Sequence, residues 1–124
     1  MGYKLLTQDM KTRKDSPNEM DWQDVGQCHK ATGTGGLCTD GVLHDYNDPW
    51  LAVLMNPAHA NIENPVMYET ERDGEQFDDG LKHGARRLRL VVRVPLPEVS
   101  WVQKIAFGIL ASLEVYHEIG RAHV

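Results

Sequence analysis

One stretch of the chain concentrates positive charge, although the formal net charge of the protein is −5. Its basic residues are Lys82, His83, Arg86, Arg87, Arg89 and Arg93. Alternate residues of a strand point to one face, so Arg87, Arg89 and Arg93 are predicted to share a face. A planar guanidinium binds phosphate or carboxylate through two parallel hydrogen bonds, which indicates a site for an anionic ligand. The alternative is a solvated sheet face whose arginines pair with acidic neighbours such as Glu69 and Glu71.

Three further side chains could complete such a site. His44 and Tyr46 lie two positions apart on a predicted strand, so we expect them to share a face. Trp50 follows in a predicted helix and offers a ring on which a nucleobase could stack. We expect these three residues to contact the base or sugar of a nucleotide whose phosphates the arginines hold. The alternative is a hydrogen-bonded structural histidine and a tryptophan that anchors the core.

No catalytic set and no metal site are predicted. The chain contains neither a hydrolase nucleophile motif nor a zinc-protease helix motif. Cys28, His29, Cys38 and His44 are metal-ligand types, but their spacing does not match a compact zinc knuckle. We therefore predict a protein that acts by binding, without a cofactor or a metal.

The hydrophobic pattern predicts an α+β domain, in which a short central helix and a longer C-terminal helix pack on a small antiparallel or mixed sheet. Strands are expected at residues 3–7, 22–31, 37–46, 64–77 and 85–97, and helices at 47–57 and 100–118. Segment 9–21 is polar and is expected to form a loop or a loose hairpin. The Asp-Gly pairs at positions 40 and 73 indicate a hairpin turn or bulge and a turn, respectively.

The short central helix has clear end signals. Asp48 can cap its first N–H groups, and the residue before Pro57 is expected to end it. Trp50, Val53 and Leu54 recur at helical spacing and are predicted to form its buried face.

The last strand and the last helix carry the strongest patterns. The core face of the strand is expected to consist of Leu88, Leu90, Val92 and Val94. Ser100 and Gln103 form a capping box that would begin the helix. Some apolar residues of this helix lie outside its main apolar face. These residues could contact a second copy of the chain, so a homo-oligomer is one possible arrangement.

Length and composition favour one soluble domain, residues 1–118, because 124 residues with 41% hydrophobic content are typical of a single globular unit. The negative net charge argues against indiscriminate nucleic-acid binding. No apolar run is long enough for a membrane span or a signal peptide, so we expect a cytoplasmic protein without a membrane partner.

The last six residues, 119–124, look like translated DNA from a sequencing adapter. Back-translation of Ile119 to Val124 agrees in one frame with the start of a widely used adapter. We therefore expect this segment to be a non-native tail that carries no function.

Most of the chain resembles a family of small uncharacterised phage and prophage proteins. The resemblance rests on "YKLLTQDM" near the start, on "GLCTDGVLHDYNDPW" in the centre, and on "YETERDG" and "LRLVVRVPLPE" later. It implies a phage accessory protein in the host cytoplasm, with a role in host takeover or in countering host defence.

A second resemblance is to ADP-ribosyl-transferring folds. Tyr3, His44, Tyr46 and either Glu69 or Glu71 would occupy the corresponding places. Lys4 stands where that family carries its first-strand arginine or histidine signature, which departs from the family's pattern.

Three hypotheses follow. The protein sequesters a phosphorylated nucleotide signal from a host defence system, or it blocks a host defence protein in the manner of an anti-CRISPR inhibitor. In the second case the acidic segment 73–79 would cover a basic groove. The third is an ADP-ribosyl-type enzyme.

Overall fold

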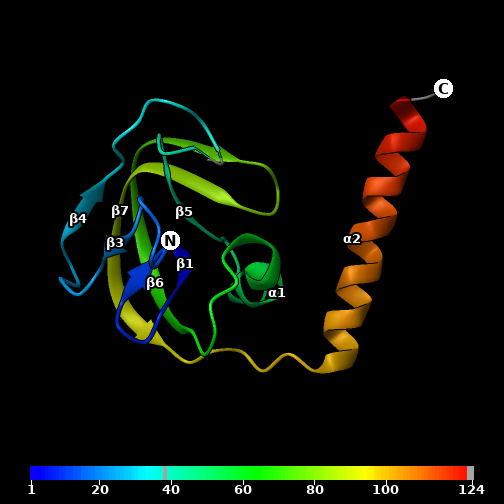
Figure 1. Ribbon diagram of the computed structural model, residues 1–124, viewed down its shortest axis with the longest axis horizontal. Coiled ribbons are helices and arrows are strands. Elements are labelled where there is room, and N and C mark those ends of the chain that lie inside the picture. Colours follow the sequence, from blue (N-terminus) through cyan, green and yellow to red (C-terminus); the bar gives the residue numbers. More distant parts are fainter. Residues whose placement is uncertain (38, 123–124) are drawn as a thin grey trace.

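The computed structural model describes residues 1–37 and 39–122, and the side chains of the last helix as far as Val115. The elements follow one another as β1 (Gly2–Leu6), β2 (Lys11–Thr12), β3 (Met20–Asp21), β4 (Cys28–Lys30), β5 (Leu43–Asp45), α1 (Pro49–His59), β6 (Val66–Asp78), β7 (His83–Val94) and α2 (Trp101–Ala122) (Figure 1). The main antiparallel sheet has the order β1-β6-β7-β4, and β5 also pairs with β7. This architecture confirms the predicted α+β fold.

Alternation along the strands divides the core between the two faces of the sheet. Leu6 packs with Trp22 and Leu88 in one cluster. Leu5, its neighbour on β1, packs with Met67 and other residues against α1 in a second cluster. Neighbouring residues of a strand point to opposite faces, so β1 contributes to both clusters.

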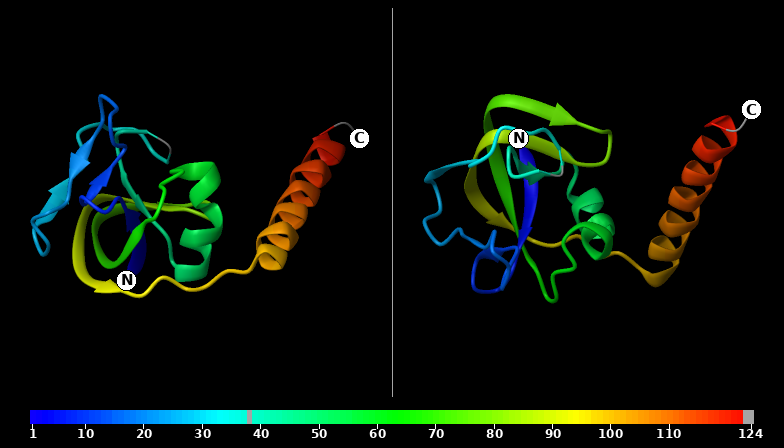
Figure 2. Two further views of the ribbon diagram at one scale, coloured as in Figure 1. Left: turned by 60° about the horizontal axis from the view of Figure 1, so that its bottom comes forward. Right: turned by 45° about the horizontal axis from the view of Figure 1, so that its top comes forward.

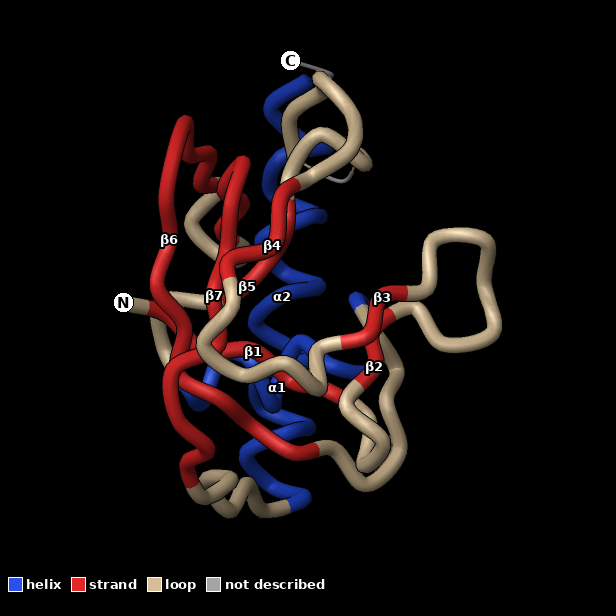
Figure 3. The backbone as a smooth tube through the Cα atoms, turned by 90° about the vertical axis from the view of Figure 1, so that its left-hand side faces the viewer, coloured by secondary structure: helices blue, strands red, loops and turns tan. Residues whose placement is uncertain are grey.

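The polar segment 9–21 forms the expected hairpin. β2 pairs with β3 in antiparallel register, and Figure 3 shows this hairpin projecting to one side of the main sheet. Trp22 follows it and is buried, and its indole Nε1 donates a hydrogen bond to Thr12 Oγ1 at 2.9 Å. This hydrogen bond ties the hairpin to a residue of the core.

Two features of the predicted short helix are wrong. α1 continues through Pro57 to His59, because the Asn56 side chain bonds the backbone N–H and C=O of Ile62 and holds the end of the helix in place. Its buried residues are Ala52 and Met55, and Trp50 is 45% exposed. Nearly the whole helix is apolar, so periodicity alone did not decide which side would face the sheet.

The strand and turn boundaries of β6 also differ from the prediction. The expected turn at Asp73-Gly74 is a local irregularity in the ladder, and the strand continues to Asp78. Gly74 has φ +80°, a backbone conformation that glycine adopts without strain. The chain turns instead near Gly80, which has φ +88°.

Two of the predicted early strands are shorter than expected. In segment 22–31 only β4 is a strand, because the chain turns at Gly26, which has φ +95°. Among the described residues of segment 37–46, only β5 is a strand, and it pairs with β7 instead of forming a local hairpin across Asp40 and Gly41.

Helix α2 begins with the predicted capping box. The backbone N–H of Gln103 donates to Ser100 Oγ at 3.1 Å, and that of Ser100 donates to Gln103 Oε1 at 2.9 Å. The helix lies apart from the sheet at the end of an extended segment (Figure 2) and reaches the core through Phe107. The side chains of the predicted tail, residues 119–124, lie outside the described part of the structure.

A buried carboxylate joins three strands. Asp45 on β5 is fully buried, and both of its oxygens accept hydrogen bonds from Arg72 Nε at 2.8 and 2.9 Å. Thr70 Oγ1 donates to it at 2.5 Å, and His83 Nδ1 lies 3.3 Å away. A Cβ atom on Gly2 would lie 2.1 Å from Asp45 Oδ2, so only glycine fits beside the carboxylate.

We predict that Asp45→Ala lowers the free energy of unfolding by about 3–5 kcal/mol, because it leaves the charge of Arg72 buried without its partner. Urea denaturation monitored by tryptophan fluorescence measures this change. The matched control is Asp73→Ala, which removes an exposed ion pair with Arg87 and should cost about 1 kcal/mol or less. Equal losses in the two variants would contradict a special role for Asp45.

Candidate functional site

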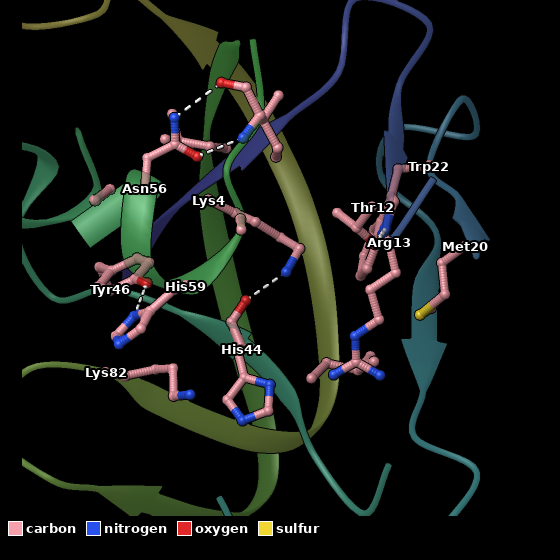
Figure 4. Close-up of a pocket in the computed structure, with 15 residues that line it drawn as sticks. Lys4, Thr12, Arg13, Met20, Trp22, His44, Tyr46, Asn56, His59 and Lys82 are labelled. Atoms are coloured by element: carbon pink, nitrogen blue, oxygen red, sulfur yellow. Dashed lines mark hydrogen bonds between the residues drawn. The ribbon is translucent and has the colours of Figure 1, made fainter. Parts of the chain in front are cut away.

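A cavity of about 330 Å³ lies where β1, the β2–β3 hairpin, β5 and α1 meet (Figure 4). Five of the residues that line it have basic side chains: Lys4, Arg13, His44, His59 and Lys82. Among its fifteen lining residues, all within the described ranges, none is acidic. The lining therefore gathers basic groups without a carboxylate among them, on a protein with a net charge of −5.

The basic side chains reach the cavity from separate parts of the chain. Lys4 lies in the middle of β1, and Arg13 directly follows β2 in a turn with φ +52°. His59 ends α1, and Lys82 immediately precedes β7. Their convergence depends on the pairing of β1 and β5 with the long β6–β7 hairpin.

Lys4 is the most perturbed cation of the site. Burial lowers the pKa of its ammonium group from 10.5 to about 8, and the positive charge of Arg13 adds to the decrease. The negative charge of Asp45 opposes this effect. Lys4 Nζ donates a hydrogen bond to the backbone oxygen of His44 at 2.5 Å. At neutral pH the side chain is a partly desolvated cation with one fixed hydrogen-bond partner.

His44 is neutral at physiological pH. Burial lowers its pKa from 6.5 to about 4, and the positive charges of Lys82, Lys4 and Arg13 contribute further. Its imidazole therefore lines the cavity without a charge.

Tyr46 and His59 form a hydrogen-bonded pair on the wall of the cavity. The Tyr46 hydroxyl and His59 Nδ1 share a hydrogen bond, and the two rings are stacked with their centroids 5.9 Å apart. Burial, followed by the charge of Lys82, lowers the pKa of His59. This pair can pass a proton between a phenol and an imidazole at the edge of the cavity.

The remaining wall is largely apolar. It includes Leu5, Met20, Leu43, Ala52 and Ile62. Such a mixture of apolar surface and a few convergent polar groups is typical of small-molecule sites.

The predicted arginine face lies elsewhere and is neutralised. Arg87 Nε bonds Asp73 Oδ2 at 2.7 Å, and Arg89 forms an ion pair with Glu71. Both ion pairs cross from β7 to β6 on the solvent side. Arg87 and Arg89 therefore match the alternative interpretation, in which the arginines pair with acidic neighbours.

Arg93 does not share the face of the other two arginines. Arg89 pairs with Glu71 on β6, whereas Arg93 pairs with Tyr68, and a register shift separates the two pairs. Glu71 and Tyr68 are three positions apart, so their side chains point to opposite faces. The same irregularity leaves Val92 48% exposed instead of in the core. The predicted grouping of Arg87, Arg89 and Arg93 is therefore wrong.

Of the other predicted ligand contacts, His44 and Tyr46 line the cavity and Trp50 does not. The sequence did not predict a ligand site that includes Lys4, Arg13 or His59. No local pattern marks them, because Lys4 and His59 are isolated basic residues, and Arg13 lies in a polar segment that also contains Lys11 and Lys14. Lys82 belonged to the basic stretch but was not assigned to the ligand site.

Comparisons with protein-family models, with curated proteins and with solved structures find no match for this chain. In the described part of the chain, no helix combines the length and apolarity needed to cross a bilayer. The described residues contain no group of three or more side chains suited to bind a metal, and Cys38 lies outside them.

We predict that His44 titrates with a pKa of about 4 in the folded protein, measured by NMR of the imidazole resonances. The unfolded chain binds this proton more tightly than the folded protein does. The free energy of unfolding should therefore fall as the pH decreases from about 6.5 to 4. His44→Gln should remove the resonance and reduce the slope. A pKa near 6.5 would show that the ring is solvated and not part of the cavity wall.

Proposed function

We propose that the protein binds a small phosphorylated molecule in the cavity between β1, β5 and α1. The observation that supports the proposal is the convergence of three cations and two imidazoles without an acidic lining residue in the described structure. Lys4 is subject to the repulsive charge of Arg13 as well as to the attraction of the Asp45 carboxylate, and an anion in the cavity would offset the repulsion. The partly buried position of Lys4 strengthens its attraction for an anion compared with an exposed lysine.

The size and the lining of the cavity favour a ligand with both an anionic and an apolar part. A volume of about 330 Å³ lies at the lower end of the range for ligand pockets. Arg13 and Lys82 would hold the phosphate, Lys4 would add to the positive charge that attracts the ligand, and the apolar wall would contact the rest of the molecule. His44 and Tyr46 would fix its orientation through hydrogen bonds.

The resemblance to phage proteins supports a biological setting for this binding. A small protein that binds a phosphorylated nucleotide tightly can lower its free concentration and so counter a defence system that uses it as a signal. The competing proposal of a protein-binding inhibitor has less support, because the acidic segment 73–79 is engaged internally. Its Asp73 and Glu75 pair with arginines of β7, and Asp78 accepts a hydrogen bond from Asn47.

We predict that a phosphorylated ligand raises the melting temperature of the wild-type protein in a thermal-melt screen of nucleotides and sugar phosphates. A ligand at a hundred times its Kd adds about 2.7 kcal/mol, or on the order of 10 °C for a domain of this size. Lys4→Met should abolish the shift. Arg89→Ala, which removes an exposed cation outside the cavity, should retain it. A shift lost in Arg89→Ala but kept in Lys4→Met would place the site on the outer face instead.

An ADP-ribosyl-type enzyme is the second candidate, and one feature of the sheet favours it. Tyr3 on β1 pairs with Glu69 on β6, and it also forms a bridge to Tyr46. Three of the residues named by that resemblance are therefore neighbours. Glu71, the alternative acid, is bound to Arg89. The acid of such an enzyme would therefore be Glu69.

If the protein is such an enzyme, we predict that it releases nicotinamide from NAD and that Glu69→Gln abolishes the release, because the variant lacks the carboxylate. Chromatographic detection of nicotinamide measures the activity. Glu71→Gln serves as the matched control and should stay active. Absence of release by the wild-type protein would contradict this candidate and leave the binding proposal intact.

A further inference from the structure

Lys4 occupies an unusual position for a lysine. Its side chain leaves the centre of β1 and places Nζ 5.4 Å from the centroid of the Trp22 ring. Figure 4 shows the amine pointing into the cavity, between the wall that carries Tyr46 and His59 and the wall that carries Arg13. The ammonium group of an exposed lysine is surrounded by water, whereas that of Lys4 lies in the cavity among other side chains.

This position increases the fraction of neutral amine, which is the nucleophilic form of lysine. Burial disfavours the ammonium ion most, the charge of Asp45 opposes this effect and the charge of Arg13 adds to it, and the pKa of Lys4 is lowered to about 8. A desolvated lysine beside another cation is a recurrent form of activated amine in carbonyl chemistry. The hydrogen bond to the His44 carbonyl oxygen fixes the direction of the amine.

The other groups of the cavity are suited to a substrate that is both anionic and a carbonyl compound. Arg13 and Lys82 supply the positive charge for binding the anion, so Lys4 is left to react with the carbonyl group. The Tyr46–His59 pair supplies an exchangeable proton on the wall of the same cavity. Anion binding, a nucleophilic amine and a proton donor are the three elements that imine formation requires.

We propose that Lys4 forms an imine with phosphorylated aldehydes, such as the open-chain form of an aldose phosphate, whose phosphate binds at Arg13 and Lys82. This inference rests on the proposed anion-binding function of the cavity and names the class of ligand.

The step is balanced without an oxidant or a reductant. The lone pair of Lys4 Nζ attacks the carbonyl carbon, and the C=O π electrons move to the oxygen. One proton moves from the nitrogen to this oxygen to give a neutral carbinolamine. The Tyr46–His59 pair protonates the hydroxyl group, which leaves as water while the nitrogen lone pair forms the C=N bond. The second nitrogen proton then returns to the pair, so one amine and one aldehyde give one imine and one water. Water reverses the reaction, so the aldehyde is held reversibly.

Pyridoxal 5′-phosphate, a phosphorylated aldehyde, is the probe that tests the proposal. The full-length protein is incubated with one equivalent at pH 7.5, reduced with borohydride, and mapped by peptide mass spectrometry. Lys4 should be modified at least about tenfold faster than the exposed Lys14 and Lys104, because a larger fraction of its amine is neutral at this pH. Inorganic phosphate should slow the reaction at Lys4 by competing for the cations.

Two variants separate the roles of charge and nucleophile. Lys4→Arg keeps a cation but cannot form an imine, so it should lose trapping at this position. Lys82→Gln keeps the amine but removes a phosphate contact, so it should slow modification of Lys4 relative to that of Lys104. Trapping that is equal at all three lysines in the wild-type protein would overturn the proposal without any variant.

Pyridoxine 5′-phosphate, which lacks the aldehyde, distinguishes this inference from the function on which it rests. Binding of this analogue in calorimetry, with no borohydride trapping of the aldehyde at Lys4, would overturn imine formation and leave the anion-binding function standing. Absence of both binding and trapping would overturn the two together. Binding of the analogue together with selective trapping at Lys4 supports both.

Discussion

The buried carboxylate of Asp45 is the interaction on which the rest of the structure depends. It is bound by Arg72 and Thr70 from β6 and approached by His83 from β7, so it connects the short strand β5 to the long central hairpin. A buried charge without these partners would be strongly unfavourable. These contacts of the carboxylate hold β5 against the hairpin, although Arg72 Nη2 and His83 Nδ1 are buried without a hydrogen-bond partner of their own. The glycine at position 2 lets β1 pass close beside the carboxylate.

The same network sets the geometry of the cavity. His44 precedes Asp45 on β5, and Tyr46 directly follows the strand and bridges to Tyr3. Alternation of the extended chain turns both side chains away from the carboxylate, and both line the cavity. Lys4 then reaches the His44 carbonyl group from β1. One side of β5 therefore satisfies a buried charge, while the other presents hydrogen-bonding and basic groups to a ligand.

The two groups of basic residues differ in what surrounds them. Arg87 and Arg89 lie on the outer face, where water and adjacent carboxylates neutralise them, and such exposed pairs contribute little free energy. Lys4 lies in a partly enclosed cavity where no lining residue of the described chain is acidic. The perturbed pKa values of Lys4 and His44 both result from this enclosure, and they connect anion binding to the proposed chemistry of the amine.

The sequence by itself determined the elements whose signals are local. The cap of α1 by Asp48, the capping box of α2, and the fold class follow from interactions between near neighbours and from short periodicities. The shared orientation of His44 and Tyr46 toward the cavity could also be predicted in this way. Only the tertiary structure decided which basic residues meet, because Lys4, Arg13, His59 and Lys82 converge through strand pairings distant in sequence. A register shift reversed the face of Arg93, and a register shift depends on the partner strand as well as on the residue's own segment.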